Sequence, residues 1–136
     1  MEALRHWIAK GPWLQTSLSL RSAHVDTYSR ERLRDWRKEI LRKGRHVQAL
    51  RRKELHRLRI QCKRYRYILA ALQTLGVTLE RPELEFAEAA RRVHRALGDL
   101  RDLKRLRRSA HGQPPHYRRA KRKLLQRAVR AFGRRR

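Results

Sequence analysis

Apolar residues recur every three or four positions along two long stretches of the chain, and this spacing constrains the fold more than any other feature. In residues 52–75 the apolar residues are spaced 3-4-3-4-3, and they are Leu55, Leu58, Cys62, Tyr65, Leu69 and Leu72. In residues 82–109 the apolar residues are spaced 4-3-4-3, and they are Phe86, Ala90, Val93, Leu97 and Leu100. Residues three and four apart share one face of an α-helix, so both stretches predict helices that pack through an apolar seam. No stretch shows the alternation of a β-strand, and the predicted fold is all-α.

Glycine and proline fall where helix ends are needed. A short first helix is expected to stop at Gly11-Pro12, and Ser29 and Gly44 are candidates to begin and end the next one, with Trp36 on its seam. The expected helices cover residues 3–10, 29–44, 52–75, 82–109 and 115–132. Short connections favour antiparallel neighbours, so the last four predict an up-down antiparallel four-helix bundle.

The expected organisation of the chain has three parts. Residues 1–28 form a short N-terminal helix and a connector, in which residues 14–27 are rich in Ser, Thr and Leu. Residues 29–132 form the bundle, and residues 133–136 form a basic tail.

Positive charge is the second constraint. The chain has 38 Lys and Arg but 12 Asp and Glu, a net charge of +26 in 136 residues. A charge of this size opposes compaction unless a polyanion neutralises it, so nucleic acid, polyphosphate or an acidic membrane surface is the expected partner. Cys62 is the one cysteine and allows no internal disulfide, and no apolar run approaches the roughly 18 residues of a membrane span. These features favour the cytoplasm.

The segment LHRLRIQCKRYRY, residues 55–67, places its charges on one side of a helix. At about 100° per residue, an arc beside the apolar seam holds the side chains of Arg52, His56, Arg59, Lys63, Arg66 and Tyr67. Arg57 and Arg64 are expected to point elsewhere. Cations that border a seam line a groove between helices, where a chain-like anion would be partly desolvated; the alternative is a solvated face.

The helix over 82–109 is expected to supply the other wall. If it runs antiparallel to its predecessor, the side chains level with His56 are those of Arg101, Asp102, Lys104 and Arg108. Asp102 is then expected to orient His56 or Arg59 through a charge-assisted hydrogen bond. In the helix over 29–44, Arg30, Arg34 and Arg37 share a flank, and the sequence does not decide whether that flank joins the groove.

These residues resemble the signature of the CHAD family, the conserved-histidine α-helical domains. Its motif, H-x-x-R-x-x-x-K-R-x-R-Y, is matched by His56, Arg59, Lys63, Arg64, Arg66 and Tyr67. The stretch before the motif, with Gly44, Arg45 and His46, is similar to the basic helix and loop of the family. The segment WIAKGPW is similar to the linker that leads into the second half of such domains. The segment ALGDLRDLKRL resembles the family's L-G-x-L-x-D element, with Asp102 as its acid.

The resemblance implies half of a double four-helix bundle that binds inorganic polyphosphate. The helix geometry and the resemblance together predict these binding residues: Arg34, Arg37, Arg45, His46, Arg52, His56, Arg59, Lys63, Arg66, Tyr67, Arg101, Lys104 and Arg108. A full domain is about twice as long, so a half binds more weakly, or two copies pair as a homodimer, or the sequence is a fragment. The implied location is the cytoplasm, at polyphosphate granules. Because a protonated His56 donates more strongly, we expect tighter binding at about pH 6 than at about pH 8.

Three other interpretations of the sequence imply different functions. The basic helices and the tail RRAKRKLLQRAVRAFGRRR also suit an RNA- or DNA-binding protein, which is the main alternative. An enzyme is not expected. Cys62 lies on an apolar seam, and residues 83–87 lack the lysine of the E-x-E-x-K strand motif that triphosphate-processing tunnel domains carry. The seven histidines are not spaced as metal ligands are. No cofactor and no metal are therefore expected. The basic helix over 115–132 is expected to close the bundle and not to contact lipid.

Overall fold

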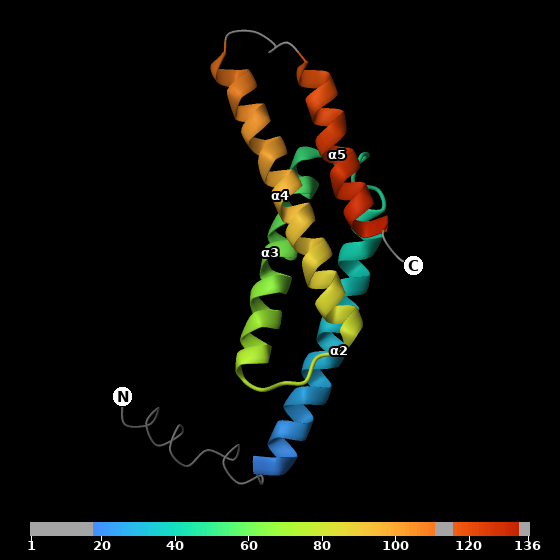
Figure 1. Cartoon of the computed structure of the whole chain (residues 1–136), viewed down its shortest axis with the longest axis vertical. Helices are drawn as coiled ribbons and strands as arrows, with labels where there is room; N and C mark the ends of the chain where they lie inside the picture. Colours follow the sequence, from blue (N-terminus) through green and yellow to red (C-terminus); the bar gives the residue numbers. More distant parts are fainter. Residues whose placement is uncertain (1–17, 111–115, 134–136) are drawn as a thin grey trace, which may run out of the picture.

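A computed structural model describes residues 18–110 and 116–133, which form four helices (Figure 1). These are α2 (Leu18–Gly44), α3 (Arg52–Thr74), α4 (Arg81–Ser109) and α5 (Tyr117–Gly133). The chain runs alternately up and down through them, and α4 packs mainly between α3 and α5, while α2 contacts all three (Figure 1). The predicted all-α bundle is confirmed, with no strand in the residues that the structure describes.

The helix ends agree with the sequence except at α2. Helices α3, α4 and α5 begin and end within two residues of their predicted bounds. The prediction that Ser29 starts a helix after a connector is wrong, because α2 is continuous from Leu18 to Gly44. Residues 18–43 contain neither Gly nor Pro, and the low helix propensity of Ser and Thr costs only a few tenths of a kcal/mol each. The short helix expected over 3–10 and the tail after Gly133 lie outside the described residues.

The two predicted seams form the core. Leu58, Cys62, Tyr65 and Leu69 of α3 are buried, as are all five seam residues of α4. An aromatic series joins the four helices. Tyr65 lies edge-on to Trp36 and Phe86, with ring centroids 5.8 Å and 4.9 Å away, and Phe86 stacks on Phe132 at 6.1 Å. Contacts of this geometry add about 0.5–1.5 kcal/mol each to the burial of the rings.

Two glycines have specific roles at helix ends. Gly76 ends α3 with φ +80°, a left-handed conformation that an L side chain rarely adopts. At the end of α2, a Cβ on buried Gly44 would collide with the Phe132 ring. Gly44 therefore lets α5 close against α2.

Ion pairs attach α2 to the first turn of α4. Arg34 lies 3.7 Å from Glu80 on the surface. Arg37 Nε lies 3.2 Å from Glu83 Oε1, and the two side chains are only 16% and 3% exposed. The contact is poorly aligned for a hydrogen bond, and the hydroxyl of buried Tyr65 has no hydrogen-bond partner among the residues that the structure describes. Burial raises the pKa of Tyr65, and the Glu83 charge adds to that effect. The buried Arg37–Glu83 ion pair therefore serves to hold α2 against α4.

This arrangement disfavours one predicted binding residue. The Arg37 guanidinium is largely enclosed with Glu83 between α2 and α4 and already has a countercharge there. The flank that it shares with Arg34 faces the N-terminal end of α4, so that flank does not join a groove at the other end of α4.

Two further findings concern membranes and metals. None of the described helices is both long enough and apolar enough to cross a membrane. Within residues 18–110 and 116–133, no three His, Cys, Asp or Glu side chains are grouped as a metal ion would require.

Candidate anion-binding site

A cavity of about 780 Å³ lies between the start of α3 and the end of α4. We call it the α3–α4 groove. Its walls carry eight Lys or Arg side chains and His56, and the remaining three lining residues are leucines. The basic lining residues are Arg52, Lys53, His56, Arg57, Arg59, Arg101, Lys104, Arg105 and Arg108.

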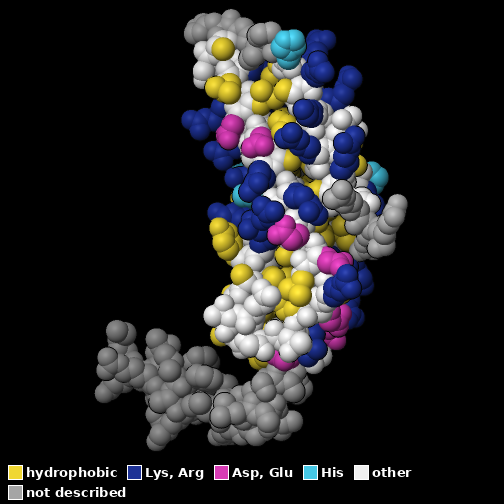
Figure 2. Space-filling model, in the orientation of Figure 1, with side chains coloured by type: hydrophobic (Ala, Val, Ile, Leu, Met, Phe, Trp, Pro, Cys, Tyr) yellow, Lys and Arg dark blue, Asp and Glu magenta, His cyan; other side chains and the backbone are white. Residues whose placement is uncertain are grey.

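The cations of the α3–α4 groove form no ion pair with any carboxylate of residues 18–110 and 116–133. No carboxylate lines it, and the six ion pairs found among the described residues all involve other side chains. Leu55, Leu97 and Leu100 form its apolar part. Charge–charge interactions are stronger beside such low-dielectric material than in open water, so the walls would attract an anion strongly. Figure 2 shows Lys and Arg crowded over the middle and upper parts of the visible face, with few acids among them.

Lys104 lies where cations from three helices meet. Burial lowers the pKa of its ammonium; Tyr117 opposes this effect, and Lys121, Arg52 and Arg108 lower the pKa further. The four cations come from α3, α4 and the start of α5. Arg107 also lies 4.9 Å from the centre of the Tyr117 ring, which joins the same two ends of α4 and α5.

A second cavity, of about 330 Å³, adjoins the groove at Arg59. We call it the His94 cavity, and it is lined by Arg59, Arg66, Arg91, His94, Arg95, Gly98, Asp99 and Asp102. The Arg59 Nε would lie 3.8 Å from a Cβ on Gly98, so the side chain crosses α4 where α4 has no side chain. Arg59 thereby lines both cavities.

His94 is surrounded by the basic side chains of α3. Burial lowers the pKa of its imidazole, and Arg59, Arg66 and Lys63 lower it further. Its Nε2 is buried without a hydrogen-bond partner in the described parts of the chain. An anion bound to those three cations would weaken their effect and favour the protonated imidazole.

The structure brings together most of the predicted site residues. Six of them line the α3–α4 groove, namely Arg52, His56, Arg59, Arg101, Lys104 and Arg108. Arg66 lines the His94 cavity. Lys63 and Tyr67 are exposed beside it, with Lys63 Nζ 5.6 Å from the Tyr67 ring centre.

Besides Arg37, three predicted residues lie apart from this surface. Arg45 and His46 are exposed in the turn after α2 and line neither cavity. Arg34 is held at the opposite end of α4 by Glu80. Their roles in binding stay predictions, and the position of Arg34 disfavours its role.

Asp102 does not make the bond expected of it. It forms neither an ion pair nor a hydrogen bond with His56 or Arg59 among the described contacts. The rotation of α4 directs it to the His94 cavity, which it shares with Arg59, while His56 lines the α3–α4 groove.

Several lining residues are not predicted by the sequence pattern. Arg57 was expected to point away, but it lines the α3–α4 groove with Lys53 and Arg105, since long side chains reach around the helix. His94 was also missed. Its spacing gave a usable signal, because His94, Arg101 and Arg108 are seven residues apart and share one face of α4.

One family of known proteins matches the chain. A family model described as the CHAD domain matches residues 1–111. The match includes all of α3 and α4, and α5 lies beyond it. No curated protein and no solved structure matches the chain.

Proposed function

The chain belongs to the CHAD family, and from that premise we propose that it binds inorganic polyphosphate in the α3–α4 groove without catalysing a reaction. Association of the family with polyphosphate supports the ligand, and the cavity supports the place. The proposal includes a cytoplasmic location at polyphosphate granules.

The observation that carries the proposal is a groove lined by eight Lys or Arg side chains and no acid. Polyphosphate presents only oxygens, about one negative charge per phosphate, and no base edges. Arginine suits such a ligand because its planar fork can donate two parallel hydrogen bonds to phosphate oxygens. Binding would also remove the repulsion between the facing walls.

Each wall would hold one side of the polymer. Arg52 and Arg59 donate from α3, and Lys104 and Arg108 donate from α4. The leucines between them exclude water, which strengthens each charged hydrogen bond. Next to the groove, His94 becomes a better donor because bound phosphate favours its protonated form.

A binding role without catalysis is supported by the chemistry of the lining. The groove offers no carboxylate as a general base. Cys62 is buried, and desolvation raises the pKa of its thiol to about 12, so almost no thiolate nucleophile exists at neutral pH. The donors that line the groove can bind an anion without changing it chemically.

Nucleic acid is the alternative ligand. Readers of single strands usually expose aromatic rings on which bases stack. Here Tyr65 and Phe86 are buried and Trp36 packs against the core, which leaves Tyr67 as an exposed ring on the basic surface, at 62% exposure. Long-chain polyphosphate should therefore displace an oligonucleotide at equal phosphate concentration. Retention of the oligonucleotide would favour the alternative.

Calorimetric titration with medium-chain polyphosphate tests the proposal. The variant is Arg52→Gln/Arg101→Gln/Arg108→Gln, which changes three exposed groove cations. The control is Lys38→Gln/Arg42→Gln/Lys123→Gln, which removes the same charge from exposed positions on α2 and α5. Loss of three exposed ionic contacts of about 0.7 kcal/mol each should weaken binding about 30-fold, and the control should change it far less. Equal losses would reduce the proposal to general charge attraction.

We also propose that two copies of the chain pair. Tyr28 and Ile68 are 64% and 45% exposed beside a cavity of about 520 Å³ between α2 and α3, whose wall includes Trp36 and Leu72. Exposed apolar surface of this kind favours association. Sedimentation should show a dimer that Ile68→Glu converts to a monomer; a monomeric wild-type protein would end the dimer proposal and leave polyphosphate binding intact.

A further inference from the structure

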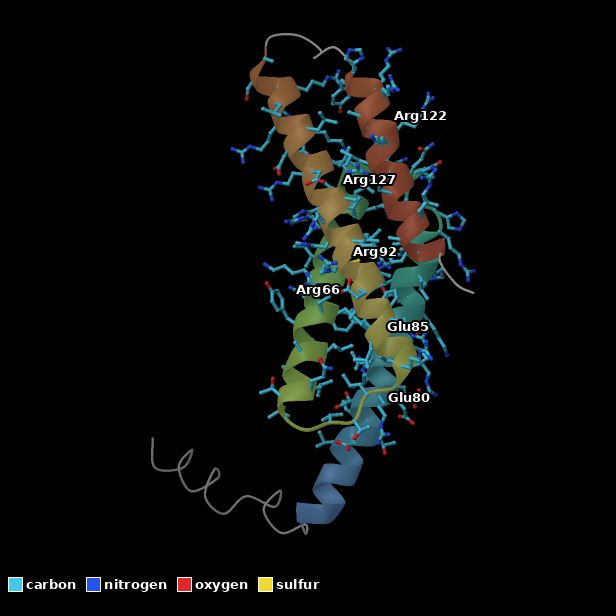
Figure 3. All side chains as sticks on the ribbon, in the orientation of Figure 1. Arg66, Glu80, Glu85, Arg92, Arg122 and Arg127 are labelled. Carbon is cyan, nitrogen blue, oxygen red and sulfur yellow. The ribbon has the colours of Figure 1, made fainter. Side chains whose placement is uncertain are left out.

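A third cavity, of about 320 Å³, lies on the other side of α4, against α5. We call it the α4–α5 arginine site. Its lining consists of Arg91, Arg92, Arg95, Ala96, Asp99, Arg127, Arg130 and Ala131. Figure 3 shows Arg92 of α4 and Arg127 of α5 on the same face of the molecule.

The charge of this site is also unbalanced. Arg91 pairs with Glu88 at 3.0 Å, whereas Arg92, Arg95, Arg127 and Arg130 form no ion pair within the described residues. Those four side chains are exposed, and Asp99 is the single acid of the lining. Arginines from two facing helices therefore repel one another with little compensation, as the α3–α4 groove cations do.

The three basic cavities adjoin in series. Arg59 lines both the α3–α4 groove and the His94 cavity. Arg91, Arg95 and Asp99 line both the His94 cavity and the α4–α5 arginine site. A basic path therefore crosses α4 from one side of the helix to the other.

We propose that the α4–α5 arginine site is a second binding segment for the same polyanion. It takes the part of a long phosphate chain that extends beyond the α3–α4 groove. The inference rests on the proposed function and adds a preference for chain length. Its α5 half lies beyond the residues that match the family. Two linked segments raise the affinity for a ligand that spans both and leave a ligand that fits one unaffected.

The test measures two ligands with one variant. Arg127→Gln/Arg130→Gln removes the α5 half of the site, and both residues are exposed and free of ion pairs with described residues. Affinity for long-chain polyphosphate should fall about tenfold, while the tightest tripolyphosphate site should keep its affinity. The control Arg118→Gln/Arg122→Gln removes equal charge from exposed positions of α5 and should have a much smaller effect. Thermal unfolding confirms that all variants are folded.

The possible outcomes distinguish failure of the second binding segment from failure of the proposed function. A long-chain affinity that the double variant leaves unchanged, or lowers no more than the control does, overturns the second segment while the α3–α4 groove stands. An equal loss for tripolyphosphate also overturns it, because the arginines would then belong to the primary site. A wild-type protein that binds neither phosphate polymer would refute the proposed function itself.

Discussion

The two ends of α4 treat positive charge in opposite ways. At the N-terminal end, Arg34, Arg37 and Arg81 each lie against a glutamate, and one of those pairs is buried. At the C-terminal end, the cations of the α3–α4 groove face one another with no acid between them. The comparison teaches that a count of basic residues does not locate a binding surface. The distribution of the few acids is more informative, because it determines which of the described cations the fold already uses and which lack a countercharge.

The largest expected effect comes from breaking the paired end. Glu83→Gln leaves the Arg37 guanidinium enclosed without its countercharge, and the free energy of unfolding should fall by about 3 kcal/mol. Denaturant titration measures this loss. The matched variant Glu85→Gln disrupts an exposed pair with Arg81 and should cost less than about 0.5 kcal/mol. Similar losses for both would mean that the Arg37–Glu83 pair has no special structural role.

Neutralising the unpaired end should have the opposite sign. In the absence of ligand, Arg52→Gln/Arg101→Gln/Arg108→Gln should stabilise the protein by about 0.5–1 kcal/mol at low salt, because it removes like-charge repulsion. Unfolding experiments at low and high salt measure the gain, and salt should reduce it. A destabilised triple variant would show that these cations have partners in the fold.

His94 makes the pH dependence of the unpaired end measurable. Burial and its cationic neighbours lower its pKa in the folded protein, so the unfolded chain binds the proton more readily. Its contribution to stability is therefore complete above the ordinary histidine pKa of 6.5 and is lost as pH falls below that value. Denaturant titration across that range should show this loss in the wild-type protein and not in His94→Gln.

Bound polyphosphate should reverse part of the decrease in the pKa of His94. By weakening the effect of Arg59, Arg66 and Lys63, the bound anion raises the pKa of His94. Binding should then be about two- to threefold tighter at about pH 6 than at about pH 8. If His56→Gln and not His94→Gln abolishes this difference, the sequence-based expectation for His56 stands and the role of His94 is refuted.

The smallest expected effect concerns Tyr67. Its ring lies 5.6 Å from Lys63 Nζ in an exposed contact worth about 0.5 kcal/mol. Tyr67→Leu should weaken polyphosphate binding no more than about threefold. A loss of single-stranded RNA binding of about tenfold or more, with polyphosphate affinity intact, would instead identify a stacking platform and support the nucleic-acid alternative.

Periodicity allowed most of the fold to be predicted. Seams such as Leu58–Cys62–Tyr65 have one stable solution, which is burial against other helices. The start of α2 could not be predicted, because Ser and Thr near residue 27 suit both a connector and a helix. Propensity differences of this size are smaller than the packing free energy that decides between them.

The site could be predicted along α3 but less well across helices. The arc of α3 follows from 100° per residue, and its Arg52, His56 and Arg59 line the α3–α4 groove, while Arg66 lines the adjoining His94 cavity. The fate of Arg37 could not be inferred, since it depends on Glu83, which is 46 residues away in the sequence and comes to it only through the packing of α2 on α4. The rotation of α4 that turns Asp102 toward the His94 cavity was equally hidden.

Lysine acetylation with and without polyphosphate tests the central claim most directly, since it reports where the ligand lies. Lys53 and Lys104 line the α3–α4 groove, and exposed Lys38 on α2 is the internal control. At a ligand concentration ten times Kd, acetylation of Lys53 and Lys104 should slow about tenfold and that of Lys38 should not change. Equal protection of all three lysines, or protection of Lys38 alone, would contradict the account.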